Sequence, residues 1–251
     1  APWGKGRPGW HTECVVMIRN IFGGLIDIHG GGTDLRFPHH ENEIAQNYCL
    51  HHDNLANYWI HNARLDLRGE KMSKSLGNVV WLKDIIVEYH PNAFRLAILA
   101  NHYRQVINYQ DDMMRQMQGE WEKNKKLYVS VFRKLELCDA LDGGKPLELM
   151  DNFLNEMAYD FNTSNAITHL YAIMKKMNAD IRRKDLSVEE LQNEFKTFKD
   201  MLYILGINVD IKPLSIEEKE IVLSWQDARN NRDFEKADEL RNKINELGIR
   251  L

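Results

Sequence analysis

Three residues with metal-binding side chains occur near the start of the chain, Cys14, His39 and Glu43. If the residues from His39 onward are helical, His39 and Glu43 lie one turn apart and share a face of the helix. A thiolate, an imidazole and a carboxylate together are reasonable zinc ligands. A helical His-x-x-x-Glu pair is usually just ordinary surface polarity, and Cys14 lies well upstream. The pattern therefore leaves a zinc site and a polar helix surface both open.

A run of glycines follows a short apolar segment, in the sequence His29-Gly-Gly-Gly-Thr-Asp34. Glycines at such a place let a ligand approach the backbone closely. A carboxylate beyond the end of a strand can bind ribose hydroxyls. A plain strand-to-helix turn has the same composition, and a glycine triplet standing alone favours that simpler interpretation.

Two lysines and two serines form the segment Lys71-Met-Ser-Lys-Ser75, between Gly69 and Gly77. This composition predicts a mobile cationic loop, which suits a polyphosphate whose charge rises in a transition state. A solvated surface loop is the alternative, because most loops rich in lysine and serine are of that kind.

The elements around these residues follow an α/β pattern. Residues 25–28 are typical of a buried strand, Pro38 suits the first turn of a helix over residues 39–50, and residues 58–67 indicate a second strand. Strand, helix and strand at this spacing predict a parallel α/β unit. Two further helices are expected over residues 82–90 and 92–100.

Beyond about residue 110, apolar residues recur at three- and four-residue spacing, which indicates amphipathic helices. Ser187 with Glu190, and Ser215 with Glu218, match capping boxes. We predict an antiparallel helical bundle and then a terminal helical hairpin. The apolar stripes are Met117, Trp121, Tyr128, Phe132 and Leu135; Met150, Phe153, Met157 and Phe161; Leu170, Ile173, Met177 and Ile181; Leu191, Phe195, Phe198, Leu202 and Leu205; and Phe234, Ala237, Leu240, Ile244 and Leu247.

Composition narrows the class of protein. The 251 residues carry a formal net charge of −4, which argues against a generic DNA-coating protein but allows RNA binding by a local basic face. No apolar run approaches the length needed to cross a bilayer, and the first residues lack an apolar signal-peptide core. We therefore expect a cytoplasmic protein. Cys14, Cys49 and Cys138 are poor material for a disulfide framework, and we expect Cys49 and Cys138 to pack in the core.

Four segments together resemble one known family. Residues 71–75 resemble the second signature of the class I aminoacyl-tRNA synthetases. Residues 9–14 and 37–46 resemble stretches particular to the cysteinyl enzymes of that class, and residues 231–238 are similar to their C-terminal hairpin. The segments occur in the expected order and the resemblance covers nearly the whole chain.

The resemblance implies an activity, a fold and partners. Members of this family activate L-cysteine with ATP, with magnesium, and transfer the cysteinyl group to the 3′ end of tRNA(Cys). One zinc ion per subunit takes the substrate thiolate and selects it over a serine hydroxyl. The implied fold is the C-terminal half of a Rossmann-like nucleotide-binding catalytic domain, followed by a helical bundle and a terminal helical hairpin. A monomer is implied, with no membrane or DNA as partner.

The resemblance also assigns roles to single residues. By motif position, Cys14, His39 and Glu43 are expected to bind zinc, and Trp10 and His29 to line the cysteine pocket. Gly32 and Asp34 occupy the positions that hold the nucleoside of ATP. Lys74, with Lys71, is expected to stabilise the pyrophosphate.

The expected domain boundaries follow the motifs. Residues 1–76 would be the second half of the catalytic domain, residues 77–112 a connecting region, residues 113–210 the tRNA-binding bundle and residues 211–251 the hairpin. The family's first signature, a His-Ile-Gly-His-like turn, and its other zinc cysteine have no counterpart here. We therefore expect an N-terminal half outside this chain, and no cysteine-dependent ATP–pyrophosphate exchange by these residues alone.

Two other functions are compatible with the same residues. A related ligase uses zinc and ATP to join cysteine to an amino sugar, and it too would carry the lysine loop. The long helical region and the final hairpin favour the tRNA enzyme. A non-catalytic RNA-binding or interaction fragment is the third possibility, which the missing first signature motivates.

Overall fold

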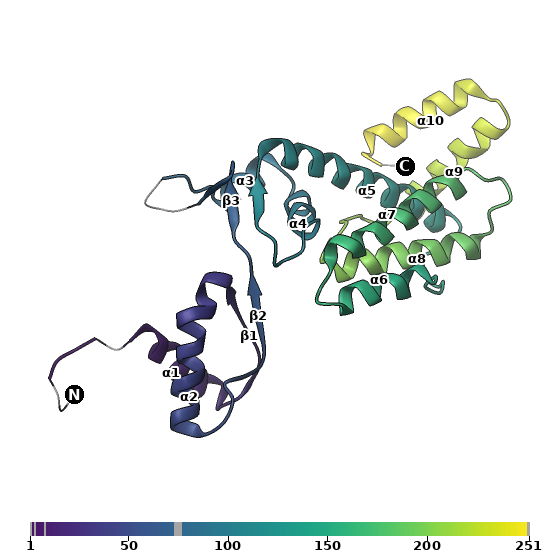
Figure 1. The fold of residues 1–251 in the computed structure, drawn as a ribbon. Coiled ribbons are helices and arrows are strands. Elements are labelled where there is room, and N and C mark those ends of the chain that lie inside the picture. Colours follow the sequence, from purple (N-terminus) through teal and green to yellow (C-terminus); the bar gives the residue numbers. More distant parts are fainter. Residues whose placement is uncertain (1, 3, 8, 73–76, 250–251) are drawn as a thin grey trace. The chain divides into compact units, whose positions relative to one another are not determined.

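A computed structural model describes residues 2, 4–7, 9–72 and 77–249, and it divides the chain into two compact units (Figure 1). The first unit comprises Ala1–Val80 and Asn101–Gln110 and contains every strand of the described residues. The second comprises Trp81–Ala100 and Asp111–Leu251 and is helical. The predicted order, α/β and then all-α, is confirmed, whereas the boundaries of the four predicted segments remain a prediction.

A parallel pair of strands forms the frame of the first unit. Strand β1 (Ile26–Gly32) and strand β2 (Ala56–Asn62) pair in parallel, and α2 (Glu41–His51) lies between them in sequence. Helix α1 (Trp10–Phe22) packs against α2 (Figure 1). The predicted parallel α/β unit is therefore confirmed. Its geometry aligns the last residues of both strands, since Gly32 lies opposite Asn62.

The prediction of one continuous strand over residues 58–67 was wrong. Strand β2 ends at Asn62, and β3 (Leu65–Leu67) belongs to a second sheet. There β3 pairs with β4 (Glu70–Lys71) in antiparallel fashion and with β5 (Ile107–Tyr109) in parallel. The physical reason is a change of partner: β1 ends opposite Asn62, so the following residues find hydrogen bonds elsewhere.

The helix expected to start at His39 starts two residues later. Residues Thr33–Leu35 form a 3₁₀ turn (η1) and Arg36–His40 a π-helical turn (η2), in which Phe37 is extended (φ −134°, ψ 132°). Such a wide turn is typical of functional sites. It rotates His39 and His40 together toward the interior, where both are buried.

Helix α2 buries polar residues and exposes apolar ones. Its fully buried positions are Glu43 and Asn47, whereas Tyr48 and Leu50 are exposed. A helix stabilised by packing alone would show the reverse pattern. Because buried polar groups are costly unless they are satisfied, this inverted face indicates that α2 serves a site.

The second unit is built from amphipathic helices, as predicted. Its core includes the fully buried Trp121, Phe153, Leu170 and Phe198. The helices are α3 (Leu82–Glu88), α4 (Pro91–Leu99), α5 (Asp111–Leu137), α6 (Leu149–Ala158), α7 (Thr163–Asp180), α8 (Val188–Ile204), α9 (Ile216–Asn230) and α10 (Phe234–Glu246). Three stripe residues expected in the core are exposed instead. Helix α6 ends at Ala158, so Phe161 lies in the following turn with φ 52°. Phe234 and Leu247 lie at the two ends of α10, where none of the described elements covers them.

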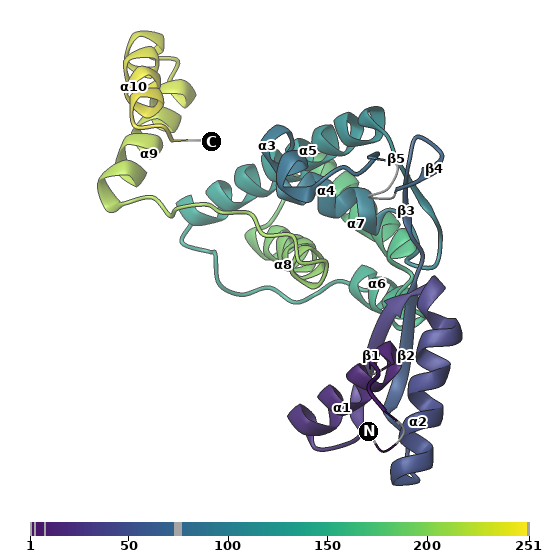
Figure 2. The same ribbon diagram turned by 90° about the vertical axis from the view of Figure 1, so that its left-hand side faces the viewer.

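Both predicted capping boxes are present, at Ser187 with Glu190 and at Ser215 with Glu218. Helices α9 and α10 pack side by side as the predicted hairpin (Figure 2), and Asp233 caps α10. None of the described helices is long and apolar enough to span a membrane.

Candidate functional site

The three predicted metal ligands meet in the first unit, although they come from three different elements. Cys14 lies on α1, His39 in the π-helical turn and Glu43 on α2. His39 Nε2 lies 2.8 Å from Glu43 Oε1 and 3.7 Å from Cys14 Sγ. One ligand atom from each residue falls within 4.8 Å of the other two. The packing of α1 against α2 therefore produces a convergence that the spacing alone did not establish.

Glu43 is the centre of the cluster and its side chain is fully buried. Its second oxygen, Oε2, lies 2.9 Å from His29 Nε2 on β1. The contacts of Glu43 with His39 and with His29 both have ion-pair distances. Within the described chain, however, neither carboxylate oxygen of Glu43 receives a hydrogen bond of normal geometry. His29 Nε2 makes no such bond either. A misaligned donor satisfies a buried acceptor poorly, so the carboxylate is not fully compensated despite these short distances. A cation at this point would compensate the carboxylate.

The Cys14 thiol faces an unfavourable environment for its anion. Burial raises the pKa of Cys14 from its ordinary value of 9.0 to about 11, and the neighbouring Glu43 carboxylate adds to the effect. The thiolate is the form that ligates a metal. A bound cation would outweigh both influences, because a coordinating thiol is deprotonated outright.

The donor set fits zinc. Sulfur, imidazole nitrogen and carboxylate oxygen are the ligand types that zinc takes in proteins, and the set includes a soft thiolate. A second group of possible ligands, His29, His40 and Glu43, shares the same carboxylate. It lacks a thiolate, and His40 Nδ1 is already 2.8 Å from His61 Nε2. The group with Cys14 is therefore the better zinc site.

Two tryptophans stack on the histidines of the cluster. The ring centroids of Trp10 and His39 are 4.0 Å apart, with an interplanar angle of 25°. The ring centroids of Trp59 and His29 are 4.5 Å apart, with an interplanar angle of 15°. Trp10 is 56% exposed, so its other face is open to a ligand. Trp10 and His29, the residues predicted to line the cysteine pocket, thus both adjoin the metal cluster.

The glycines of residues 30–32 allow a close approach between β1 and the π-helical turn. A Cβ on Gly31 would lie 2.8 Å from His40 Cε1 and one on Gly32 would lie 2.5 Å from Asp34 Oδ1. Real Cβ atoms do not tolerate such distances, so a larger residue would displace the His40 ring at position 31 and the Asp34 side chain at position 32. Gly31 and Gly32 therefore have a packing role at this turn.

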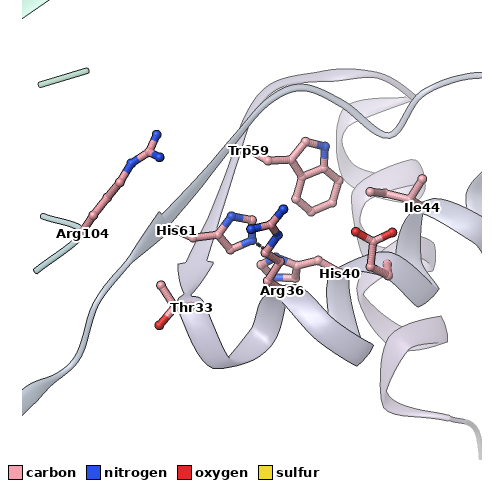
Figure 3. Close-up of a pocket in the computed structure, with 8 residues that line it drawn as sticks. Thr33, Arg36, His40, Ile44, Trp59, His61 and Arg104 are labelled. Atoms are coloured by element: carbon pink, nitrogen blue, oxygen red, sulfur yellow. Dashed lines mark hydrogen bonds between the residues drawn. The ribbon is translucent and has the colours of Figure 1, made fainter. Parts of the chain in front are cut away.

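A cavity of about 580 Å³ adjoins the cluster at His40 (Figure 3). Burial lowers the pKa of both His40 and His61, which favours their neutral forms. The wall combines histidines and a tryptophan with two arginines and one carboxylate, so aromatic rings and charged groups both face the cavity. The lining residues are Thr33, Arg36, His40, Glu41, Ile44, Trp59, His61 and Arg104.

Comparison with known families identifies both halves of the chain. Residues 1–119 match the family of class I (C) tRNA synthetase catalytic domains, and residues 152–209 match the DALR domain. Residues 1–119 belong to the class I tRNA synthetase catalytic domains. Such a catalytic domain followed by a helical domain is the predicted fold.

Similar proteins agree with this assignment. The synthetase chain is 44% identical over 249 residues to a cysteine–tRNA ligase of Acholeplasma laidlawii, and 39% identical over 256 residues to one of Anoxybacillus flavithermus. Each alignment covers 99% of this chain and 55% of the relative, so the chain spans about half the length of these proteins.

A solved structure matches the fold. It is a ternary LeuRS–tRNA–LeuAMS complex from Agrobacterium radiobacter K84, with a TM-score of 0.55 and 17% identity. The match covers 72% of the synthetase chain and 27% of the other. At this identity the likeness concerns the fold alone.

The lysine segment of the synthetase chain is described only in part. Lys71 belongs to β4 and is exposed. In the antiparallel β3–β4 ladder its backbone lies opposite that of Asp66. Lys74 lies outside the described residues, so its predicted role stays a prediction. The same holds for the ATP-binding roles of Gly32 and Asp34, which lie at the end of β1 and in the next turn.

Two cysteine predictions for the synthetase chain were wrong. Cys49 and Cys138, expected in the core, are exposed. Cys49 lies two residues after the buried Asn47 and so faces away from the buried side of α2. Cys138 follows the end of α5 in a turn.

Sequence reasoning also missed His11, His40 and His61. A signal existed for His61, because ligands of parallel sheets bind at the carboxyl ends of strands and His61 lies near the end of β2.

Proposed function

We propose that the protein carrying this chain is a cysteine–tRNA ligase. It would activate L-cysteine with ATP and magnesium and transfer the cysteinyl group to the 3′ end of tRNA(Cys). The observation that carries the proposal is the convergence of Cys14, His39 and the buried Glu43, in a chain 44% identical to a cysteine–tRNA ligase. Because the reaction serves protein synthesis, we expect it in the cytoplasm.

Cys14, His39 and Glu43 would hold one zinc ion per subunit. When bound, zinc supplies a Lewis acid that prefers a soft thiolate to a hydroxyl, and so it distinguishes cysteine from serine. The ligands on this chain set the charge of the site: a thiolate and a carboxylate offset the two positive charges of the ion. Such discrimination exceeds what an apolar pocket provides for substrates of similar size, so editing is unnecessary.

Trp10 and His29 would orient the substrate cysteine. The stacking of Trp10 on His39 holds the indole beside the ligand cluster, and the stacking of Trp59 on His29 fixes the plane of that imidazole. Side chains locked in this way position a substrate without losing entropy at the reaction step. Their closeness to Glu43 supports the assignment.

Gly32 and Asp34 would hold the nucleoside of ATP, with Asp34 accepting hydrogen bonds from ribose hydroxyls. Lys71 and Lys74 would neutralise the pyrophosphate as its charge grows. Loss of one such donor typically costs about 3 kcal/mol of transition-state stabilisation. The cationic cavity at His40 lies in the same unit, next in sequence to a metal ligand, which supports nucleotide binding nearby.

The helical unit would contact tRNA. We propose residues 1–76 as catalytic domain, 77–112 as connection, 113–210 as tRNA-binding bundle and 211–251 as hairpin, in a protein that acts as a monomer. The match of residues 152–209 to the DALR domain supports the bundle assignment.

Aminoacylation tests the proposal directly. The protein that carries this chain should attach cysteine to tRNA(Cys) in an ATP-dependent reaction and should reject serine. Parallel reactions with an amino-sugar acceptor separate the related ligase, because the product would then be a cysteinyl amino sugar. Failure to charge a cognate tRNA, with zinc present, contradicts the proposal.

A further inference from the structure

We propose that His11 is a positioning residue that selects the tautomer and ring orientation of His39. The inference rests on the metal site of the proposed function, and it concerns a residue to which neither the sequence motifs nor the ligand set gave a role. His11 lies on the first turn of α1, directly after Trp10 and one turn before Cys14.

The contact between the two imidazoles is direct. Nδ1 of His11 lies 2.6 Å from Nδ1 of His39, a hydrogen-bond distance. The opposite nitrogen of the same His39 ring, Nε2, points at Cys14 Sγ and Glu43 Oε1. His39 therefore has one nitrogen toward the ligand cluster and the other toward His11.

Metal ligation decides which nitrogen carries the proton. A ligating nitrogen needs its lone pair, so Nε2 of His39 must be unprotonated and its proton must lie on Nδ1. That N–H then donates to Nδ1 of His11, which must be the acceptor. His11 accordingly carries its own proton on Nε2. Histidine ligands generally donate their second N–H to a partner in this way.

Stacking alone does not provide the same selection. Trp10 covers the face of His39 at 4.0 Å and restrains the plane of the ring. A flip of that ring by about 180° about its Cβ–Cγ bond keeps the ring in the same plane, and so keeps the stacking, but it replaces Nε2 by carbon at the cluster. The hydrogen bond to His11 is lost in the rotated ring, so His11 distinguishes the two orientations.

Two substitutions of equal size separate a hydrogen-bonding role from a packing role. In His11→Asn the amide oxygen can occupy the place of Nδ1, since both atoms are bonded to Cγ, and it retains an acceptor. In His11→Leu the same place holds a methyl group. Neither variant changes a proposed metal ligand.

The experiment measures zinc affinity of the full chain by competition with a chelator, and the absorption spectrum of the cobalt-substituted chain. We expect His11→Leu to weaken zinc binding about 10–100-fold and to alter the cobalt bands. His11→Asn should stay within about threefold of the unsubstituted chain and keep its spectrum. Circular dichroism of the metal-free variants controls for folding.

The possible results are distinguishable. Equal affinities for all three chains, or an equal loss in both variants, would overturn the positioning role of His11 while leaving the metal site in place. Absence of zinc binding by the unsubstituted chain would instead contradict the proposed metal site itself.

Discussion

His29 on β1 directs its Nε2 at Oε2 of Glu43 on α2 from 2.9 Å, without forming a well-oriented hydrogen bond. A strand and a helix thus present an imidazole and a carboxylate to each other in the interior. Buried polar groups left in this state are costly. They persist where a ligand completes their contacts, which makes Glu43 the most informative residue for mutation.

Glu43→Gln should have opposite effects on metal binding and on metal-free stability. Removal of the anionic oxygen should lower zinc affinity at least tenfold. The metal-free chain should be as stable as before or more stable by about 1 kcal/mol, because a buried carboxylate without aligned donors is removed. Chelator competition and urea unfolding measure the two effects. A large loss of metal-free stability would show that Glu43 is a structural group.

Cys14→Ala should remove zinc and weaken the preference for cysteine over serine. The reason is the loss of the only thiolate in the ligand group. Metal analysis after dialysis and misacylation assays measure the result. Cys49→Ala is the matched control, because Cys49 is an exposed thiol in the same unit. Normal zinc content in the Cys14 variant would remove this residue from the site.

Asn47→Ala should destabilise the frame that carries the site by about 2–3 kcal/mol. The fully buried amide accepts a hydrogen bond from Arg19 Nε at 2.8 Å and donates to the backbone oxygen of Asp53 at 2.8 Å. It thereby connects α2 both to α1 and to the loop that follows α2. Chemical unfolding measures the loss, with Asn42→Ala on the same helix as control. Equal stability of the two variants would contradict this role.

Arg133→Met should destabilise the helical unit by about 3–5 kcal/mol, because it leaves Glu136 buried without its partner. The two side chains are 2.5 Å apart and hold the segment before α9: Arg133 donates to the Lys212 carbonyl and Glu136 accepts from the Leu214 amide.

The double variant Arg133→Met with Glu136→Leu should lose less stability than Arg133→Met alone, since no unpaired charge then remains. A double-mutant cycle on urea unfolding measures this coupling. Strictly additive losses would show that the pair acts independently.

Asp180 should contribute a pH-dependent stabilisation to the same unit. Hydrogen bonds, chiefly from Lys176, lower the pKa of Asp180 from 3.8 to about 2. A depressed folded-state pKa means that the contribution is present above pH 3.8 and is lost as the pH falls toward 2. Since Lys176 is 44% exposed, we expect only about 0.5–1 kcal/mol.

The variant Asp180→Asn isolates this effect. The difference in unfolding free energy from the unsubstituted chain should be largest near pH 5 and should shrink toward pH 2. The pH dependence of the nearby Glu194 has the opposite sign. Burial raises the pKa of Glu194, so its contribution to stability is lost as the pH rises. Because Asp180 itself helps to raise the pKa of Glu194, both chains should carry Glu194→Gln, which removes this contribution from the comparison. A difference that does not vary with pH would contradict the assignment.

Much of the helical unit was predictable because its determinants are local. The apolar stripe with Leu170, Ile173 and Met177 lies within one helix, and the capping box of Ser187 and Glu190 involves residues three apart. Such signals act through helical periodicity and backbone hydrogen bonds, which depend on neighbouring residues alone. The π-helical turn escaped prediction, since no local pattern distinguishes it from the first turn of α2.

The sequence by itself determined the helices, the parallel strand pair and, through resemblance to a family, which residues to inspect. Only the tertiary structure decided that Cys14 reaches His39 and Glu43, that the strand after Asn62 changes sheets, and that His11 contacts His39. These outcomes depend on the packing of α1 against α2 and on where β1 ends. Contacts between distant segments are set by the whole fold, so no spacing within a single segment encodes them.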